Sequence, residues 1–455
     1  HYDALETRSP QAREAALMAA LPAQVAHAKA HAPAFADLLR DVDAASVNSR
    51  TALAALPVIR KYELLERQKA ARAAGGNVFG GFSALGFGKG MTRVFASPGT
   101  IYEPEGTRGD YWRMARAMFA AGFRTGELIH NSFSYHFTPA GSMMETGAHA
   151  LGCTVFPGGI GQTEQQVTAM AELQPAGYIG TPSFLKIIVE KAAEMGVALP
   201  TVTKALVSGE AFPPSLRDWF AERGIAGYQC YATADLGLIA YETSAREGLV
   251  LDEGVIVEIV RPGTGDPVPE GEVGELVVTT LNPDYPLIRF GTGDLSAVLP
   301  GPCPTGRTNT RIKGWMGRAD QTTKVRGMFV HPGQVADVAR RFPEVGRARL
   351  VVSGEMANDQ MTMLVESTET APGLAQLIAE AVREVMRHGF ETLKLKALWC
   401  GYFADNTQSF VAQSKCGFRH HHTEENKYNP FLQDYRTEHI SCITYAQWLK
   451  LADHL

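Results

Sequence analysis

The chain has 455 residues, of which 45% are hydrophobic and 20% are charged, and its formal net charge is −5. One hydrophobic core rarely serves so long a chain, so two or three domains of a globular protein are expected. The negative charge argues against a nucleic-acid partner, which needs a basic face. No apolar run is long enough to cross a bilayer, so we also expect no membrane partner.

The N-terminal sequence and the cysteine spacing indicate the cellular compartment. The chain opens HYDALETRSP, without a basic segment followed by an apolar one, so a secretory leader is not expected. The six cysteines are scattered and form no CxxC pair. This is typical of reduced thiols rather than of a disulfide framework or a zinc ribbon. We therefore expect a cytoplasmic protein.

The first 75 residues are expected to pack rather than to carry chemistry. Residues 10–40 are rich in alanine and have helical spacing, and residues 57–61 (PVIRK) indicate a turn that leads into the next element.

Residues 93–106 form a short apolar strand that enters a Ser-Gly-Thr turn. Backbone N–H groups and hydroxyls of such a turn can hold phosphate oxygens. The turn lacks the GKS/T of a Walker loop, and Glu103 and Glu105 stand near its end, where a lysine is usual. Acidic side chains beside a phosphate are useful only when a metal ion intervenes. An ordinary loop is the alternative.

From residue 110 onward the sequence alternates helices, short apolar runs and Gly-rich turns. A helix is expected near 110–121, and apolar runs lie at 127–130, 153–159, 177–185 and 204–212. This alternation predicts a parallel sheet with helices on both faces. Ligands should bind at the loops after the carboxyl ends of its strands. The aromatic stretch 131–141 follows one such strand and either lines a pocket or packs on the sheet.

A later strand enters a turn of small residues that holds Tyr231 and Asp235. The face of a tyrosine can stack on a purine, and an aspartate can hold Mg²⁺. Residues 249–260 and 272–280 then alternate apolar and polar side chains. They are expected to be antiparallel strands of a β-rich subdomain.

Two acidic turns follow, Gly291-Thr292-Gly293-Asp294 and Gly317-Arg318-Ala319-Asp320. The carboxylate of Asp294 can accept hydrogen bonds from a diol such as ribose, and Arg318 can clamp the same sugar or its phosphate with its planar donors. Ordinary surface turns are the alternative, since Gly and Asp are common there.

These stretches carry a family resemblance. The run GELVVTTL…YPLIRFGTGDLSAV…GRADQTTKVRGMFVHPGQVADV, together with NSFSYHFTPAG, GGIGQTEQQV, GYIGTPSFL and SGEAF, resembles the phenylacetate–coenzyme A ligase branch of the adenylate-forming enzymes. The resemblance covers about residues 1–385. It implies that ATP and Mg²⁺ activate an aryl or related carboxylic acid to an acyl-AMP, from which the acyl group passes to coenzyme A.

The resemblance also implies roles for single residues. Asp235 and Arg318 would be catalytic, with Asp235 as the Mg²⁺ ligand. The acyl group would lie at Tyr135 and His136, and the small domain would rotate about Asp320. The nucleotide would contact Ser97, Gly99, Thr100, Gly209, Glu210, Tyr231, Ala232, Thr233, Asp294 and Arg318. Coenzyme A would contact Lys324, Arg326 and Gly327.

The chain departs from the family pattern at two of these sites. Its phosphate loop lacks the family's lysine, and in the motif Tyr231-Ala232-Thr233-Ala234-Asp235 a hydroxyl is missing at Ala234. Asp235 is also one methylene shorter than the glutamate usual there. An alternative function is therefore that of a catalytically weakened relative that still binds nucleotide or acyl-adenylate.

The C-terminal tail resembles something else. From about residue 388 it looks like the last part of a GCN5-related N-acetyltransferase, on the strand 395–402 and the helix that ends near 415–418. N-acyl transfer by the tail is a further alternative, although no pyrophosphate loop precedes it. The run His420-His421-His422 is expected to be solvated, because successive side chains on a strand point in different directions.

The expected fold class is α/β. A large N-terminal domain (1–317) would hold mostly parallel sheets flanked by helices plus the β-rich subdomain. A small mobile α+β domain (318–387) and the acetyltransferase-like tail (388–455) would follow. A homodimer is one assembly open to the chain.

Overall fold

The computed structural model describes residues 1–319, 323–325, 328–330, 345–353, 360–367, 386–387, 397–404, 407–429 and 434–452. The chain divides into two compact units, His1–Ala319 and Asp320–Leu455. The three-way division expected from the sequence stays a prediction.

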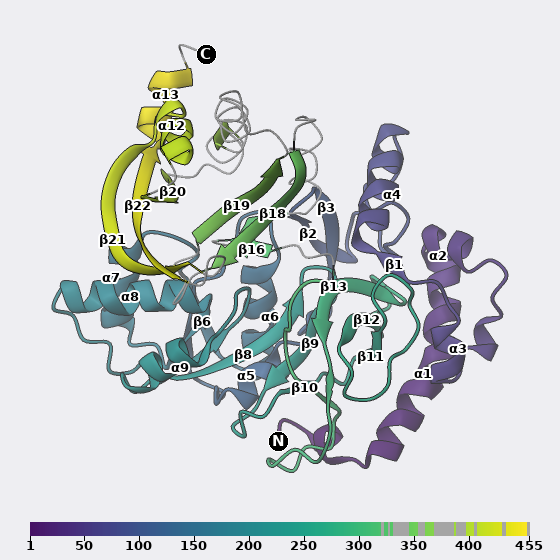
Figure 1. Ribbon diagram of the computed structural model, residues 1–455. Coiled ribbons are helices and arrows are strands. Elements are labelled where there is room, and N and C mark those ends of the chain that lie inside the picture. The colour runs from purple at the N-terminus through teal and green to yellow at the C-terminus, as the bar shows by residue number, and fades with distance from the viewer. Residues whose placement is uncertain are drawn as a thin grey trace. The chain divides into compact units, whose positions relative to one another are not determined.

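The chain begins with helices that cover one side of a small sheet (Figure 1). They are α1 (Pro10–His31), α2 (Pro33–Leu38), η2 (Ala44–Ser46), α3 (Arg50–Ala54) and α4 (Lys61–Ala73), and the short η1 (Ala4–Thr7) precedes them. The helical periodicity of residues 10–40 is confirmed, but it is split into α1 and α2 at Ala32, whose backbone is extended. The break follows from Pro33, since a proline disfavours helical geometry in the residue before it.

A sheet of nine strands forms the centre of the first unit, in the order β14-β15-β10-β9-β8-β7-β6-β4-β5. Neighbours from β5 to β8 run parallel, and the pairs from β8 to β14 are antiparallel. The strands are β4 (Leu128–Asn131), β5 (Thr154–Pro157), β6 (Gly177–Gly180), β7 (Lys204–Val207), β8 (Ala226–Thr233), β9 (Gly237–Glu242), β10 (Leu249–Leu251), β14 (Val298–Leu299) and β15 (Arg311–Ile312).

Helices cover both faces of this sheet, as the sequence predicted. Ile179 and Leu206 pack in one core with residues of α5 (Ala115–Ala120) and α6 (Ala140–Leu151). Their neighbours Tyr178, Ala205 and Val207 point to the opposite face. There they pack with α7 (Thr163–Leu173), α8 (Pro182–Glu194) and α9 (Pro214–Ala221).

Two smaller sheets complete this unit. One has the order β1-β13-β12-β11 and comprises β1 (Ile59–Arg60), β11 (Val255–Val260), β12 (Gly274–Thr280) and β13 (Phe290–Ser296). The other is the hairpin of β2 (Met91–Ser97) and β3 (Ile101–Gly106).

The antiparallel pairing of β11 with β12 confirms the β-rich subdomain. One detail of that prediction was wrong, because residues 249–251 belong to the large sheet and not to the same strand as 255–260. The turn at Asp252, whose carboxylate accepts the N–H of Gly254, separates the two strands.

The second unit contains three sheets among its described residues. Its strands and helices are β16 (Thr323–Val325), β17 (Met328–Val330), β18 (Val345–Ser353), β19 (Gln360–Ser367), β20 (Ala397–Phe403), α12 (Thr407–Lys415), β21 (Arg419–Asn429), β22 (Asp434–Thr444) and α13 (Tyr445–Ala452). The strand and the helix expected in the tail are present as β20 and α12.

His420, His421 and His422 are exposed on β21, as expected of a solvated run. Within the described residues no group of three or more His, Cys, Asp or Glu could hold a metal ion. All six cysteines are free thiols. In the part of the chain that the structure describes, no helix is both long and apolar enough to cross a membrane.

Arg289, directly before β13, is a buried cation of the sheet β1-β13-β12-β11. It is 2% exposed, and its Nε and Nη2 donate to the two carboxylate oxygens of Glu258 at 3.0 and 3.1 Å. It also donates to the carbonyls of Ala54, Leu56 and Gly265. One side chain thus joins β11 and β13 to the segment that precedes β1.

We predict that Arg289→Met lowers the free energy of unfolding by about 3–5 kcal/mol, since it leaves the carboxylate of Glu258 buried without its partner. Urea unfolding followed by circular dichroism measures the change. Arg40→Met is the control, because Arg40 pairs with Asp37 on the surface and such pairs contribute about 0–1 kcal/mol. Equal losses in the two variants would contradict the prediction.

Candidate active site

The carboxylate of Asp294 on β13 gathers three donors. Its Oδ2 accepts from the hydroxyl of Tyr231 at 2.7 Å, and its Oδ1 accepts from Trp315 Nε1 at 3.0 Å and from Arg318 Nη1 at 2.9 Å. Asp294 is 8% exposed. The structure therefore brings together Tyr231, Asp294 and Arg318, three of the residues that the family resemblance placed at the nucleotide, and adds Trp315 to them.

Local backbone geometry sets up this contact. Gly293 has φ +74°, a conformation that residues with a Cβ rarely adopt, and a Cβ there would lie 2.7 Å from Arg318 Nη2 and displace the guanidinium. An isolated β-bridge joins Asp294 to Arg318. On β8 the register shifts between Tyr231 and Ala232, a bulge of the kind that re-aims a side chain. Burial, and then the nearby Asp294 carboxylate, raise the pKa of Tyr231, so the phenol stays a donor.

A second cluster lies around Asp235, in the turn between β8 and β9. Asp235 is 3% exposed, and its Oδ2 accepts from Lys61 Nζ at 2.9 Å. Its Oδ1 is buried and has no hydrogen-bond partner within the described residues. Burial lowers the pKa of Lys61, but the carboxylates of Asp235 and Glu103 outweigh that effect and raise it. Lys61 is therefore bonded to Asp235 and also feels the charge of Glu103.

Glu103 on β3 is the second acid of this cluster. It is fully buried, and its Oε1 accepts from Ser97 Oγ at 2.7 Å. Its Oε2 has no partner within the described residues. Burial and then the charge of Asp235 raise the pKa of Glu103 well above its ordinary value, while Lys61 lowers it. Glu103 and Asp235 are therefore close enough for each charge to act on the other.

Glu105, two residues further along β3, differs from Glu103 because both of its carboxylate oxygens accept hydrogen bonds. It is 1% exposed, its Oε1 accepts from Arg93 Nη1 at 2.7 Å, and its Oε2 accepts from Trp112 Nε1 at 2.7 Å and Ser142 Oγ at 2.8 Å. Both oxygens are used within the fold. Glu105 is a structural acid, whereas Glu103 retains an unused oxygen.

The predicted phosphate loop is the tip of the β2–β3 hairpin. Ser97 is buried and directs its hydroxyl to Glu103. Gly99 and Thr100 are exposed at the tip, with φ of +97° and +63°. The Thr100 N–H donates to the Ser97 carbonyl at 3.1 Å, which closes the turn. The exposed tip presents Gly99 and Thr100 to solvent, but the hydroxyl of Ser97 points inward.

The other predicted nucleotide contacts follow neighbouring strands. Gly209 and Glu210 come after β7, where Glu210 Oε1 accepts from Ser183 Oγ at 2.6 Å. Ala232 and Thr233 end β8, and Thr233 Oγ accepts the N–H of Leu236 at 3.1 Å, which tightens the turn that carries Asp235. Their contact with a nucleotide stays a prediction.

Tyr135 and His136, predicted to line the acyl site, have different environments. The half-buried Tyr135 hydroxyl accepts from Asn131 Nδ2 at 2.8 Å and donates to Glu145 Oε2 at 2.8 Å. Burial, and then Glu145, raise the pKa of Tyr135. His136 is exposed, and its N–H donates to Ser134 Oγ at 3.1 Å. Of the two residues, Tyr135 has the more enclosed and polar setting.

For several predicted residues the structure describes no side-chain environment. Asp320, Arg326 and Gly327 fall outside the described residues. Lys324 lies on the strand β16, of whose side chains nothing is described. Their roles as hinge and coenzyme A contacts stay predictions.

The sequence analysis missed Lys61, because the first 75 residues were assigned no chemistry. A parallel pairing of β1 with β13, with Arg60 opposite Gly291, places Lys61 next to the strand that carries Asp294. No local pattern signals that pairing. Trp315 was also missed, although a tryptophan three residues before Arg318 is visible in the sequence.

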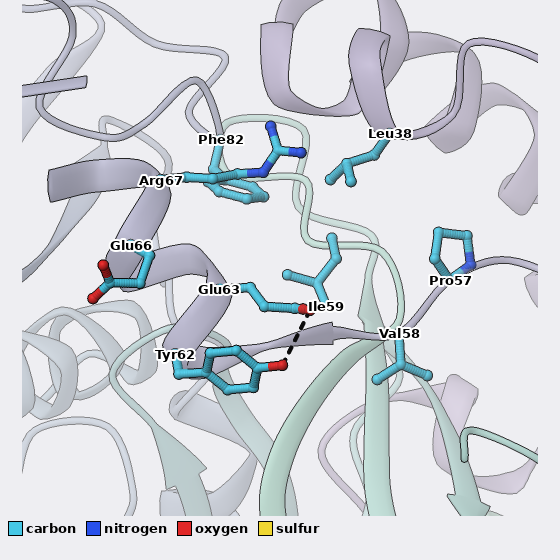
Figure 2. Close-up of a pocket in the computed structure, with 9 residues that line it drawn as sticks. All are labelled: Leu38, Pro57, Val58, Ile59, Tyr62, Glu63, Glu66, Arg67 and Phe82. Atoms are coloured by element: carbon cyan, nitrogen blue, oxygen red, sulfur yellow. Dashed lines mark hydrogen bonds between the residues drawn. The ribbon is translucent and has the colours of Figure 1, made fainter. Parts of the chain in front are cut away.

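A separate pocket of about 330 Å³ lies near α4 (Figure 2). Its lining is mainly apolar and consists of Leu38, Pro57, Val58, Ile59, Tyr62, Glu63, Glu66, Arg67 and Phe82. None of these residues belongs to the clusters around Asp294 or Asp235.

Comparison with known proteins identifies relatives of this chain. Residues 113–282 match the model of the AMP-binding enzyme family. The phenylacetate–coenzyme A ligase of Thermus thermophilus is 33% identical over 295 residues, which cover 61% of this chain and 66% of that protein. The corresponding ligase of Aromatoleum evansii is 30% identical over 319 residues, covering 66% of this chain and 72% of that protein. The matches thus span about two thirds of the relatives' length.

Solved structures show the same fold. A crystal structure of 2-hydroxyisobutyryl-CoA ligase with 2-HIB-AMP and CoA, in the thioesterification state, superposes with a TM-score of 0.70 and 23% identity. It covers 91% of this chain and 87% of the other. The α/β architecture with a small C-terminal region is therefore confirmed. None of these matched proteins is an acetyltransferase, so the predicted resemblance of the tail gains no support from them.

We predict that the ring of Tyr231, rather than its hydroxyl, carries most of its contribution to adenine binding. Tyr231→Ala should weaken ATP binding by about 1–3 kcal/mol, the range for stacking a base on an aromatic ring. Tyr231→Phe should keep most of the affinity. Calorimetric titration measures both, with Tyr62→Ala, an exposed tyrosine, as the control. Equal losses in the two Tyr231 variants would argue against stacking.

Proposed function

Since the chain belongs to the phenylacetate–coenzyme A ligase branch of the adenylate-forming enzymes, we propose that it activates a carboxylic acid with ATP and transfers the acyl group to coenzyme A. In the first step a carboxylate oxygen bonds to the α-phosphorus and pyrophosphate leaves, which gives acyl-AMP. In the second step the thiolate sulfur bonds to the acyl carbon and AMP leaves. A thiol proton is released to solvent.

The convergence of Tyr231, Asp294 and Arg318 carries this proposal. An ionised carboxylate offers about four lone-pair positions, and Asp294 uses three of them within the protein. A ribose hydroxyl would add a donor at the remaining position. Arg318 would present the rest of its planar fork to the sugar or the α-phosphate. The aromatic face of Tyr231 supplies the stacking surface for adenine.

Lys61 would offset part of the negative charge of the phosphates. Its side chain is 38% exposed while its partner Asp235 is almost fully buried. The ammonium therefore lies between a buried acid and the open side of the site. A cation placed there offsets negative charge that develops on a transferring phosphoryl group.

The residues around Asp235 fit a Mg²⁺ ion. Mg²⁺ prefers oxygen ligands such as carboxylates, and Asp235 Oδ1 is buried without a hydrogen-bond partner within the described residues. Asp235 would hold the ion in this proposal. When bound, the ion would offset the charge of the triphosphate.

The acid is proposed to be aryl or closely related. The half-buried Tyr135, bonded to Glu145, would contact it. We further propose that Lys324, Arg326 and Gly327 contact coenzyme A and that the small domain turns about Asp320. The cytoplasmic location, the homodimer and the three-domain division expected from the sequence remain part of this proposal.

We expect the full chain to release pyrophosphate only when both ATP and a suitable acid are present, and to form a thioester once coenzyme A is added. A coupled pyrophosphate assay over aryl and short-chain acids, starting with phenylacetate, measures this. Nucleotide binding without release would instead indicate a weakened relative. Acyl transfer from acetyl-CoA without ATP would indicate activity of the tail.

We predict that Asp294→Ala weakens ATP binding by about 1.5–3 kcal/mol, the range for hydrogen bonds to a charged group. The substitution removes the ribose acceptor and also frees Tyr231, Trp315 and Arg318 from their common partner. Calorimetry measures the loss, and Asp41→Ala, on the N-terminal surface, serves as the control. Unchanged affinity would remove Asp294 from the nucleotide site.

A further inference from the structure

The indole of Trp315 is an unexpected donor to the Asp294 carboxylate. Its Nε1 donates to Asp294 Oδ1 at 3.0 Å, and the same oxygen accepts from Arg318 Nη1 at 2.9 Å. The other oxygen, Oδ2, accepts from the hydroxyl of Tyr231 at 2.7 Å. Each oxygen of an ionised carboxylate has about two lone-pair positions. Within the part of the chain that the structure describes, both positions of Oδ1 are therefore filled and one position of Oδ2 remains.

Backbone hydrogen bonds hold the segment around Trp315 beside β13. The N–H of Met316, the residue after Trp315, donates to the carbonyl of Leu295 at 2.9 Å. The N–H of Leu295, the residue after Asp294, donates to the carbonyl of Gly317 at 2.8 Å. Trp315 itself is 54% exposed, so its ring lies at an accessible edge while its N–H is used by the protein. The fold thus places this donor at Asp294 before any nucleotide arrives.

A ribose carries two neighbouring hydroxyls, and each needs a lone-pair position if it is to donate to Asp294. One can use the position that remains on Oδ2. The second would have to displace a donor from Oδ1. The bond from Arg318 is an ion pair and is stronger than a bond from a neutral hydroxyl. Displacing Trp315 would exchange one neutral donor for another and would require the indole to turn away from its acceptor.

We infer that Trp315 sets the sugar specificity of the nucleotide site, because it leaves Asp294 able to accept a single ribose hydroxyl. An adenosine triphosphate that lacks the other hydroxyl, which is either the 2′-deoxy or the 3′-deoxy form, then binds about as well as ATP. Trp315 acts on the sugar through Asp294 and is a specificity-determining residue, not a catalytic one. The inference rests on the proposed function, since it takes Asp294 as the ribose acceptor.

The test is a calorimetric titration of the full chain with ATP, 2′-deoxy-ATP and 3′-deoxy-ATP, without acid or coenzyme A. In the unaltered chain we expect one analogue to bind at least about tenfold more weakly than ATP, the cost of a hydrogen bond to a charged group, and the other within about threefold of ATP. Trp315→Phe keeps an aromatic ring and frees a position on Oδ1. In that variant both analogues should bind at least about tenfold more weakly than ATP.

Two further variants complete the design. Trp219→Phe is the matched control, because Trp219 packs against Phe220 on α9, and it should bind all three nucleotides as the unaltered chain does. Asp294→Ala removes the acceptor and should bring the three affinities together. Misfolding would weaken all three nucleotides alike, so it cannot imitate a change in their ratios.

The inference is overturned if the two analogues bind alike in the unaltered chain, or if Trp315→Phe leaves both ratios to ATP unchanged. Pyrophosphate release in the presence of an acid is assayed separately. The expected ratios without release would refute only the proposed function. Release with ratios that do not depend on Trp315 would refute only this inference.

Discussion

The hydrogen bonds to the Asp294 carboxylate connect segments that are far apart in the chain. They join β8 through Tyr231, β13 through Asp294 itself, and the last residues of the first unit through Trp315 and Arg318. A carboxylate that is 8% exposed needs such partners, because an unpaired buried charge is costly. The same bonds fix the arrangement before any ligand arrives, so binding need not order these side chains again.

A second constraint comes from the short strand β1. It pairs in parallel with β13, and an ion pair between Arg60 and Glu275 ties it to β12 as well. α4 begins directly after β1, so its first residue, Lys61, is held beside the carboxylate of Asp235. The N-terminal helices thereby contribute a cation to a site otherwise built from β3, β13 and the carboxyl end of β8.

The sequence predicted those features of the fold and the site that depend on local residue patterns. Alternating apolar runs and helices predicted the parallel part of the large sheet, and the family resemblance placed Tyr231, Asp294 and Arg318 at one nucleotide site. It did not predict Lys61, since the pairing of β1 with β13 joins residues some 230 positions apart. The run 249–260 was misjudged because alternation of apolar and polar residues does not reveal that Asp252 turns the chain from one sheet to another.

The sequence alone could not distinguish the environments of Glu103 and Glu105. They occupy the same strand, two residues apart, and both are buried. Only the packing around them reveals that Arg93, Trp112 and Ser142 satisfy Glu105, whereas one oxygen of Glu103 has no partner within the described residues. Buried polar groups in native proteins are nearly always bonded, so an exception calls for an explanation. The fold therefore supplies donors to both oxygens of Glu105 and leaves one oxygen of Glu103 where a ligand can complete it. An unpaired buried oxygen costs stability in the unliganded protein.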